Sequence, residues 1–384
     1  MQFTVDISRD VLDWVRAQSG DTGLPEKITG YLSNWLEGTK KPTFNQVEQV
    51  SKATGIPFGY FFLKKPPVEN LSIVEYRTID STELLRPSRD LIDTMKHMEA
   101  VQDWMHNYLK DKIDPHEYVG SMKNRTDFYA FANKVLDVLN LKGEWRRNCH
   151  SAADLFRKIR IALSNAGVIV MMNGIVGNNT HRTLSVNEFR AFAMVDDLAP
   201  LIFINSNDSM NGKVFSLLHE FAHICLGENS LFNESLESGP SGKKNEIICN
   251  AVASEVLIPS KRFLEDWNAS DIVDLEDRIE ALAKLYCCGV IVVARKALDN
   301  NLIDRQMYAK VSGKIVRAYR EAKRKQGGGG DFYRNAASRL DHSFLFSLAE
   351  SVDTGKTTYT EAFGLTNTNR KTYANLMNQI GGLR

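Results

Sequence analysis

The sequence is short of cysteine and has no long apolar run. Only five of its 384 residues are Cys, and they are scattered along the chain. An odd and scattered set is not a disulfide framework, so it favours a reducing compartment. No uninterrupted apolar stretch reaches the roughly 18 residues of a transmembrane helix. The first residues also lack the basic and apolar segments of a signal peptide. We therefore expect a cytoplasmic protein with no membrane partner.

An excess of charge of either sign is also missing. Lys and Arg number 48 and Asp and Glu 47, which leaves a formal net charge of +1. No field of the whole protein therefore drives it onto nucleic acid or a membrane. With 43% hydrophobic and 25% charged residues, the composition is that of an ordinary globular protein. The length suggests two or three domains.

What the sequence does contain is His219-Glu220-Phe221-Ala222-His223, inside an apolar stretch from Val214 to Leu226. That stretch has no Gly or Pro, which predicts a buried helix. Positions four apart share one face of a helix, so the two imidazoles can bind the same metal ion. Glu220 follows the first His, where a metal-assisted hydrolase has its general base. This is the H-E-x-x-H pattern of zinc peptidases.

A catalytic zinc ion takes three protein ligands and leaves one position for water. A third His six residues after His223 is excluded, because Asn229 occupies that position. The remaining candidates are glutamates downstream. Glu228 is too close along the same helix to fold back. Glu234 and Glu237 lie in a polar loop, which is a poor place to fix a ligand.

Glu246 opens an apolar helix that we expect over residues 246–257, and it is our predicted third zinc ligand. Asn250 lies one turn later on the same face. It is a candidate partner that orients a ligating His through the other ring nitrogen. Glu255, further along this helix, remains the alternative ligand.

The chain divides into four predicted regions. Residues 1–66 contain short helices and end in the linker Lys64-Lys65-Pro66-Pro67, and residues 67–150 form a helical connecting region with helices at about 88–108 and 125–141. Residues 151–310 form an α+β region. Residues 311–384 contain a basic helix, a Gly-rich break and a C-terminal helical module. His97 and His106, in the first long helix, are expected to be surface or packed side chains rather than ligands.

Residues 151–310 alternate between helix and strand patterns. We expect a helix over 155–166, then strands over 168–172, 189–195 and 201–204. Asp196-Asp197 and Pro200 predict a hairpin between the last two strands. The result is a small antiparallel sheet beside a pair of active-site helices. The strand at 189–194 is expected to present a free edge to which an extended peptide can add.

Three segments of this region resemble the ImmA/IrrE metallo-endopeptidases. They run from Phe189 to Asn205, from Phe215 to Gly227 with the H-E-x-x-H pattern, and from Glu246 through Asn250 and Ala253 to Pro259. The resemblance covers about residues 150–310. It implies a zincin-like fold, with His219, His223 and Glu246 as zinc ligands and Glu220 as the base.

The N-terminal region resembles the Xre/Cro-type helix-turn-helix regulators. The matching residues run from Leu32 through Trp35, Gly38, Pro42 and Thr43 to Ala53, followed by Pro57 and Phe61-Phe62. The stretch from Gly20 to Trp35 is short for two full helices, and Gly30 interrupts the place where the recognition helix is expected. The charges in residues 1–66 nearly cancel, which does not favour DNA binding, because contacts with phosphate groups supply most of the non-specific affinity for DNA. DNA binding and a partner-docking or dimerisation role both remain open for this degenerate module.

These features predict a zinc-dependent endopeptidase that cleaves a specific protein, for instance a repressor or partner encoded nearby. The alternative is a DNA-binding regulator or an antitoxin of a toxin–antitoxin-like operon, with the peptidase fold as sensor or toxin-binding surface. The basic residues of 314–325 favour that alternative, although such a run is more typical of a solvated helix face. A fusion of two such modules resembles regulators carried on mobile elements.

Overall fold

The computed structural model describes residues 4–19, 24–67, 87–143, 145–146, 148–232, 244–325 and 338–381. Its contacts divide the chain into two units, Met1–His97 with Ile175–Leu184, and Met98–Gly174 with Ser185–Arg384. Glu234, Glu237 and the Gly-rich break at 327–330 lie outside the described residues. None of the described helices combines the length and the apolar character needed to cross a membrane.

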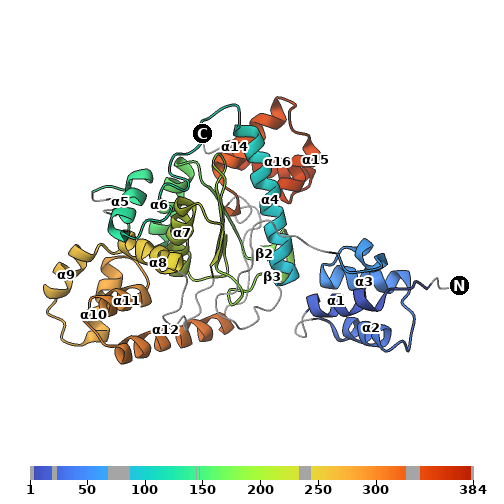
Figure 1. Ribbon diagram of the computed structural model, residues 1–384, viewed down its shortest axis with the longest axis horizontal. Coiled ribbons are helices and arrows are strands. Elements are labelled where there is room, and N and C mark those ends of the chain that lie inside the picture. Colours follow the sequence, from blue (N-terminus) through green and yellow to red (C-terminus); the bar gives the residue numbers. More distant parts are fainter. Residues whose placement is uncertain are drawn as a thin grey trace. The chain divides into compact units, whose positions relative to one another are not determined.

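The first unit begins with a helical group (Figure 1). Its elements are α1 (Arg9–Ser19), α2 (Glu26–Leu36), α3 (Phe44–Thr54) and the short 3-10 helix η1 (Phe58–Phe62). Side chains from all four fill one core, which includes Val15, Trp35, Val50 and Phe61. Thr43 and Gln46 form a capping box at the start of α3, and such a pair satisfies two backbone donors at once.

The expectation that Gly30 interrupts a helix is wrong. Helix α2 runs through Gly30 from Glu26 to Leu36. A glycine inside a helix costs only about 1 kcal/mol relative to Ala. Burial of Ile28, Leu32 and Trp35 on the inner face of α2 outweighs that cost, because each large apolar side chain contributes about 1.5–3 kcal/mol when buried.

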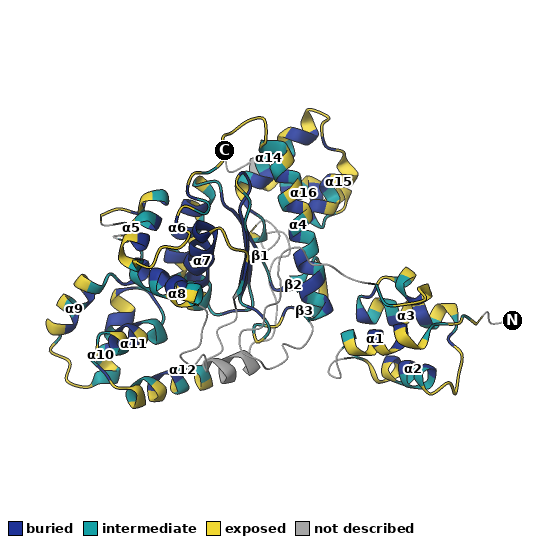
Figure 2. Ribbon diagram, in the orientation of Figure 1, coloured by how far each residue is buried: buried dark blue, intermediate teal, exposed yellow. Residues whose placement is uncertain are grey.

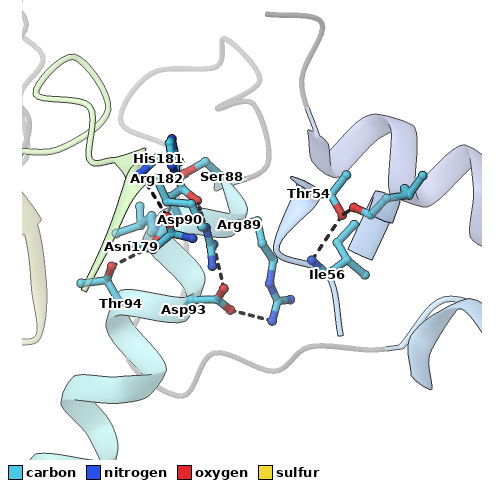
Figure 3. A network of polar contacts seen from close by, with 12 residues as sticks. Thr54, Ile56, Ser88, Arg89, Asp90, Asp93, Thr94, Asn179, His181 and Arg182 are labelled. Carbon is cyan, nitrogen blue, oxygen red and sulfur yellow. Dashed lines mark hydrogen bonds and ion pairs between the residues drawn. The ribbon is translucent and has the colours of Figure 1, made fainter. Parts of the chain in front are cut away.

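The first unit also holds the start of α4 (Arg89–Leu109) and a hairpin of β2 (Ile175–Val176) and β3 (Asn179–Thr183). An ionic network joins the two elements (Figure 3). Arg182 on β3 lies 2.7 Å from an Asp90 oxygen and 2.8 Å from an Asp93 oxygen, and Arg89 lies 2.6 Å from Asp93. These short contacts fix the hairpin against the first turns of α4.

The second unit is built on a four-stranded sheet in the order β1-β5-β4-β6. The strands are β1 (Ile169–Asn173), β4 (Ala191–Met194), β5 (Leu201–Asn205) and β6 (Ser230–Phe232). β4 pairs antiparallel with both β5 and β6, as expected for an antiparallel sheet, and β1 adds a parallel pair with β5. The hairpin between β4 and β5 is confirmed.

The expectation that β4 presents a free edge is wrong. β6 pairs with β4 on the side away from β5, through Ala193 with Ser230 and Ala191 with Phe232. Strand β6 was not predicted, because so short a strand shows no alternating pattern. The outer strands of the sheet are therefore β1 and β6.

Helices cover this sheet. α7 lies directly against it and α6 packs beside α7, while α8 and α5 continue the same helical layer (Figure 1). Residues 98–109 of α4 contact the sheet through Gln102, whose amide donates to the carbonyls of Met194 at 2.9 Å and Ala199 at 3.0 Å. The helices of this layer and beyond are α5 (Phe128–Val138), α6 (Ala152–Asn165), α7 (Met210–Leu226), α8 (Lys244–Leu257), α9 (Ser260–Asn268), α10 (Leu275–Leu285), α11 (Val290–Asp299) and α12 (Arg305–Lys325).

A C-terminal helical module completes the second unit, with α14 (His342–Asp353), α15 (Tyr359–Thr366) and α16 (Arg370–Gly381). Phe344, Leu345 and Leu348 supply its apolar face, and all three are fully buried. Asp341 caps α14 and also accepts the backbone N–H of Val170 at 3.2 Å. This contact satisfies one donor of the outer strand β1.

Candidate metal centre

The candidate site lies on α7, whose residues from Ser216 to Leu226 are all buried (Figure 2). Ser209 caps the helix by accepting the N–H of Gly212 at 3.0 Å. Gly227 ends it with a left-handed φ of 75°, a conformation that glycine adopts without steric cost. Apolar residues surround the helix, so its few polar side chains, His219, Glu220 and His223, are forced into a dry interior.

Three side chains converge as the sequence predicts. The Nε2 atoms of His219 and His223 lie 3.2 Å apart. One carboxylate oxygen of Glu246 lies 3.3 Å from Nε2 of His219, and the other lies 3.3 Å from Nε2 of His223. The ligand atoms of a tetrahedral zinc site with bonds of about 2.0–2.1 Å are roughly 3.3–3.4 Å apart. The spacing of the two imidazole nitrogens and the carboxylate group is therefore compatible with binding of a single zinc ion.

The electrostatics of this triangle favour a positive charge at its centre. Burial acts to raise the pKa of Glu246, but hydrogen bonds with His219 and His223 outweigh burial and hold the pKa well below its usual range. Burial lowers the pKa of His219, which favours the neutral ring that binds metals. For His223, burial is outweighed by the neighbouring Cys249 and Glu246, and the pKa is raised. Either a proton on one of these residues or a bound metal cation can supply this positive charge.

Helix α8 supplies more than the carboxylate. Asn250, one turn after Glu246, acts against the burial that lowers the pKa of His219, and its role as an orienting partner stays a prediction. Cys249 lies beside His223 and contributes to the raised pKa of that ring. One turn of α8 thus contacts both histidines.

Glu220 is buried beside these residues on α7. The hydroxyl of Ser230 on β6 donates a hydrogen bond to its Oε2. Within the described part of the chain, Oε1 of Glu220 has no hydrogen-bond partner. Burial raises the pKa of Glu220 to about 7, and a base is most effective when its pKa lies near the working pH.

The other candidate glutamates lie elsewhere. Both oxygens of Glu255 are used, because they accept from Lys296 and from the backbone N–H and hydroxyl of Ser260. Glu228 is exposed and accepts from the amide of Asn245 at 2.8 Å. Neither is part of the triangle around His219, and Glu234 and Glu237 lie outside the described residues.

Sequence reasoning missed Ser230 and Cys249. Ser230 reaches Glu220 only because β6 pairs with β4, and a three-residue strand gives no periodic signal. Cys249 lies three residues after Glu246, so helical spacing places the two on one face of α8, and this spacing could have identified Cys249.

A second group of potential ligands lies between α4 and the turn that joins β4 to β5. His106 of α4 lies 2.8 Å from an oxygen of Asp196, and Asp197 is adjacent. Within the described residues these two groups are the ones in which three such side chains meet.

Comparison with known families supports part of this assignment. Residues 178–297 match the IrrE N-terminal-like domain of the Peptidase_M78 family. Residues 340–379 match a domain of unknown function, DUF8813. No curated protein matches the chain. The first match covers α7 and α8 and agrees with the resemblance of these residues to the ImmA/IrrE metallo-endopeptidases.

Proposed function

We propose that this protein is a zinc-dependent endopeptidase that cleaves a specific protein, such as a repressor or partner encoded nearby. The observation that carries the proposal is the triangle of His219, His223 and Glu246 with donor atoms 3.2–3.3 Å apart. Glu220 adjoins it with one carboxylate oxygen unoccupied in the described structure. Ligand triad and base are thus present together on α7 and α8.

His219, His223 and Glu246 would hold the ion, and a bound zinc ion supplies Lewis acidity that polarises a peptide carbonyl and acidifies water. Glu220 takes a proton from the attacking water at Oε1 and delivers it to the departing amine nitrogen. The apolar surroundings of α7 exclude bulk water, which strengthens each charge interaction in the site. We expect Asn250, on the same face of α8 as Glu246, to help orient a ligating histidine.

The test is cleavage of candidate repressors by the zinc-loaded protein and by the Glu220→Gln variant. Loss of the base is expected to slow cleavage by about 10²–10⁴-fold, with zinc content unchanged. Glu228→Gln is the matched control, because Glu228 is an exposed glutamate close in sequence. Equal cleavage by wild type and Glu220→Gln would contradict the proposal.

A second role is favoured by the N-terminal helices. The continuous α2, the capped α3 and their shared core support a helix-turn-helix module that binds DNA, a toxin or another protein. We propose this as an addition to the peptidase role. A gel shift on the upstream region of its own operon tests DNA binding. Binding is expected to persist in Glu220→Gln and to disappear when residues 1–66 are removed, whereas no binding at low salt would exclude the DNA role.

A further inference from the structure

The base Glu220 is held by a hydroxyl from a different element. Ser230 is the first residue of β6, ten residues after Glu220, and its hydroxyl donates to Oε2. Ser230 is 6% exposed and Glu220 is fully buried. A carboxylate that acts as a base must be ionised, and in that state it only accepts hydrogen bonds, so Ser230 is then the donor.

The segment that delivers Ser230 is short and anchored at both ends. Gly227 ends α7 in the left-handed conformation and packs against Gly120, whose Cα would lie 3.1 Å from a Cβ added at Gly227. Asn229 accepts the backbone N–H of Val195 at 2.6 Å. Ser230 is then in register with Ala193 of β4. The hydroxyl is therefore placed by the sheet and not by α7 itself.

The two carboxylate oxygens of Glu220 have different surroundings. Oε2 is occupied by Ser230, whereas Oε1 has no partner among the described residues. A buried Glu loses the freedom of three side-chain torsions on ordering, which costs up to about 2 kcal/mol. A hydrogen bond to one oxygen fixes the rotation of the carboxylate and so determines where the other oxygen lies.

We propose that Ser230 is a positioning residue, which holds Glu220 so that Oε1 faces the reacting water. This inference rests on the proposed function, since it assumes that Glu220 is the base. The hydroxyl of Ser230 bonds to Glu220 and, in this account, does not touch the substrate. Its effect is exerted through Glu220 alone.

The test uses a probe that needs no known substrate. Acetohydroxamic acid chelates zinc through two oxygens and releases its acidic proton, which a correctly placed carboxylate accepts. Its affinity for the zinc-loaded full-length protein, measured by calorimetry, therefore reports the position of Glu220 independently of peptide cleavage. Zinc content is measured first on every variant.

We expect Ser230→Ala to retain zinc and to weaken hydroxamate binding about tenfold or more, as for loss of a hydrogen bond to a charged group. Ser230→Thr keeps the hydroxyl and is expected to restore most of the affinity. In a Glu220→Gln background, Ser230→Ala is expected to cause no further loss. Ser312→Ala is the matched control, because Ser312 is equally buried at 6% and bonds only to backbone carbonyls of α12.

The outcomes separate the two claims. Zinc binding with hydroxamate affinity unchanged in Ser230→Ala overturns the role of Ser230 and leaves the zinc site intact. An equal loss in the Glu220→Gln background also overturns it, because Ser230 would then act without Glu220. Wild-type protein that binds no zinc overturns the proposed function and this inference with it. If Ser230→Ala does not fold, the nearly isosteric Ser230→Cys, a weak donor, replaces it with the same expected loss.

Discussion

Two clusters of histidine and carboxylate side chains in the described part of the second unit differ in what their carboxylates bind. At the candidate metal centre, both oxygens of Glu246 face imidazole nitrogens at 3.3 Å. At the other cluster, Oδ1 of Asp196 accepts the backbone N–H groups of Leu198 at 2.9 Å and Ala199 at 2.7 Å while it also contacts His106. The first carboxylate contacts side chains that can themselves bind a cation, and the second is held by the backbone donors of a turn.

Burial separates the clusters as well. The side chains of His219 and His223 are 0% and 3% exposed, against 37% for His106, whereas the carboxylates are alike, at 23% for Glu246 and 22% for Asp196. The clusters therefore differ in the burial of their histidines. Proximity of ligand-type residues is insufficient, because a metal site also needs donor atoms that are not held by backbone groups.

The largest expected effect is metal-dependent stabilisation. Zinc at about 100 times its dissociation constant is expected to stabilise the folded protein by about 2.7 kcal/mol. Removal of zinc with a chelator should therefore lower the melting temperature of the wild type, and re-addition should restore it. In Glu246→Ala the same treatment is expected to change nothing. A chelator effect of equal size in both proteins would place the metal elsewhere.

A smaller effect is expected at the residue that orients a ligand. Asn250→Ala is expected to weaken zinc binding by about 10–100-fold, the usual cost of losing such a partner. Competition with a chromophoric chelator measures the affinity. Asn245→Ala is the control from the same helix, since Asn245 bonds to the exposed Glu228 and not to a histidine. Unchanged affinity in Asn250→Ala would remove that residue from the site.

The smallest effect on stability is expected at the cluster of His106, Asp196 and Asp197. Asp196→Ala is expected to lower the free energy of unfolding by about 1–2 kcal/mol, because two backbone donors lose their acceptor. Zinc content is expected to stay the same. Denaturant unfolding with metal analysis checks both quantities. A loss of zinc in Asp196→Ala would show that the comparison between the two clusters is wrong.

Local periodicity explains what could be predicted from the sequence. Helical spacing places His219 and His223 on one face of α7, and Glu246 and Asn250 on one face of α8. The candidate ligands were therefore predictable, whereas the packing of α7 against α8 that brings them together is a tertiary contact. The fold class was predictable for the same reason, since long apolar helices and strands are strong local signals.

The structural features that were not predicted depend on contacts between segments that are distant in the sequence. β6 exists as a strand only through its bonds to β4, so neither the contact between Ser230 and Glu220 nor the covered edge of β4 was visible in the sequence. The contact of His106 with Asp196, 90 residues apart, has the same origin. The prediction that Gly30 interrupts a helix failed for the opposite reason. Packing of α2 outweighs the low helix propensity of a single glycine.

The most direct test of the central claim is the zinc content of the purified full-length protein by elemental analysis, with Glu246→Ala and Asp196→Ala in parallel. The account predicts about one zinc per chain, as for a single three-ligand site, in the wild type and in Asp196→Ala, and its loss in Glu246→Ala. Wild-type protein without zinc, or Glu246→Ala protein that keeps it, would contradict the assignment of His219, His223 and Glu246 as the metal centre.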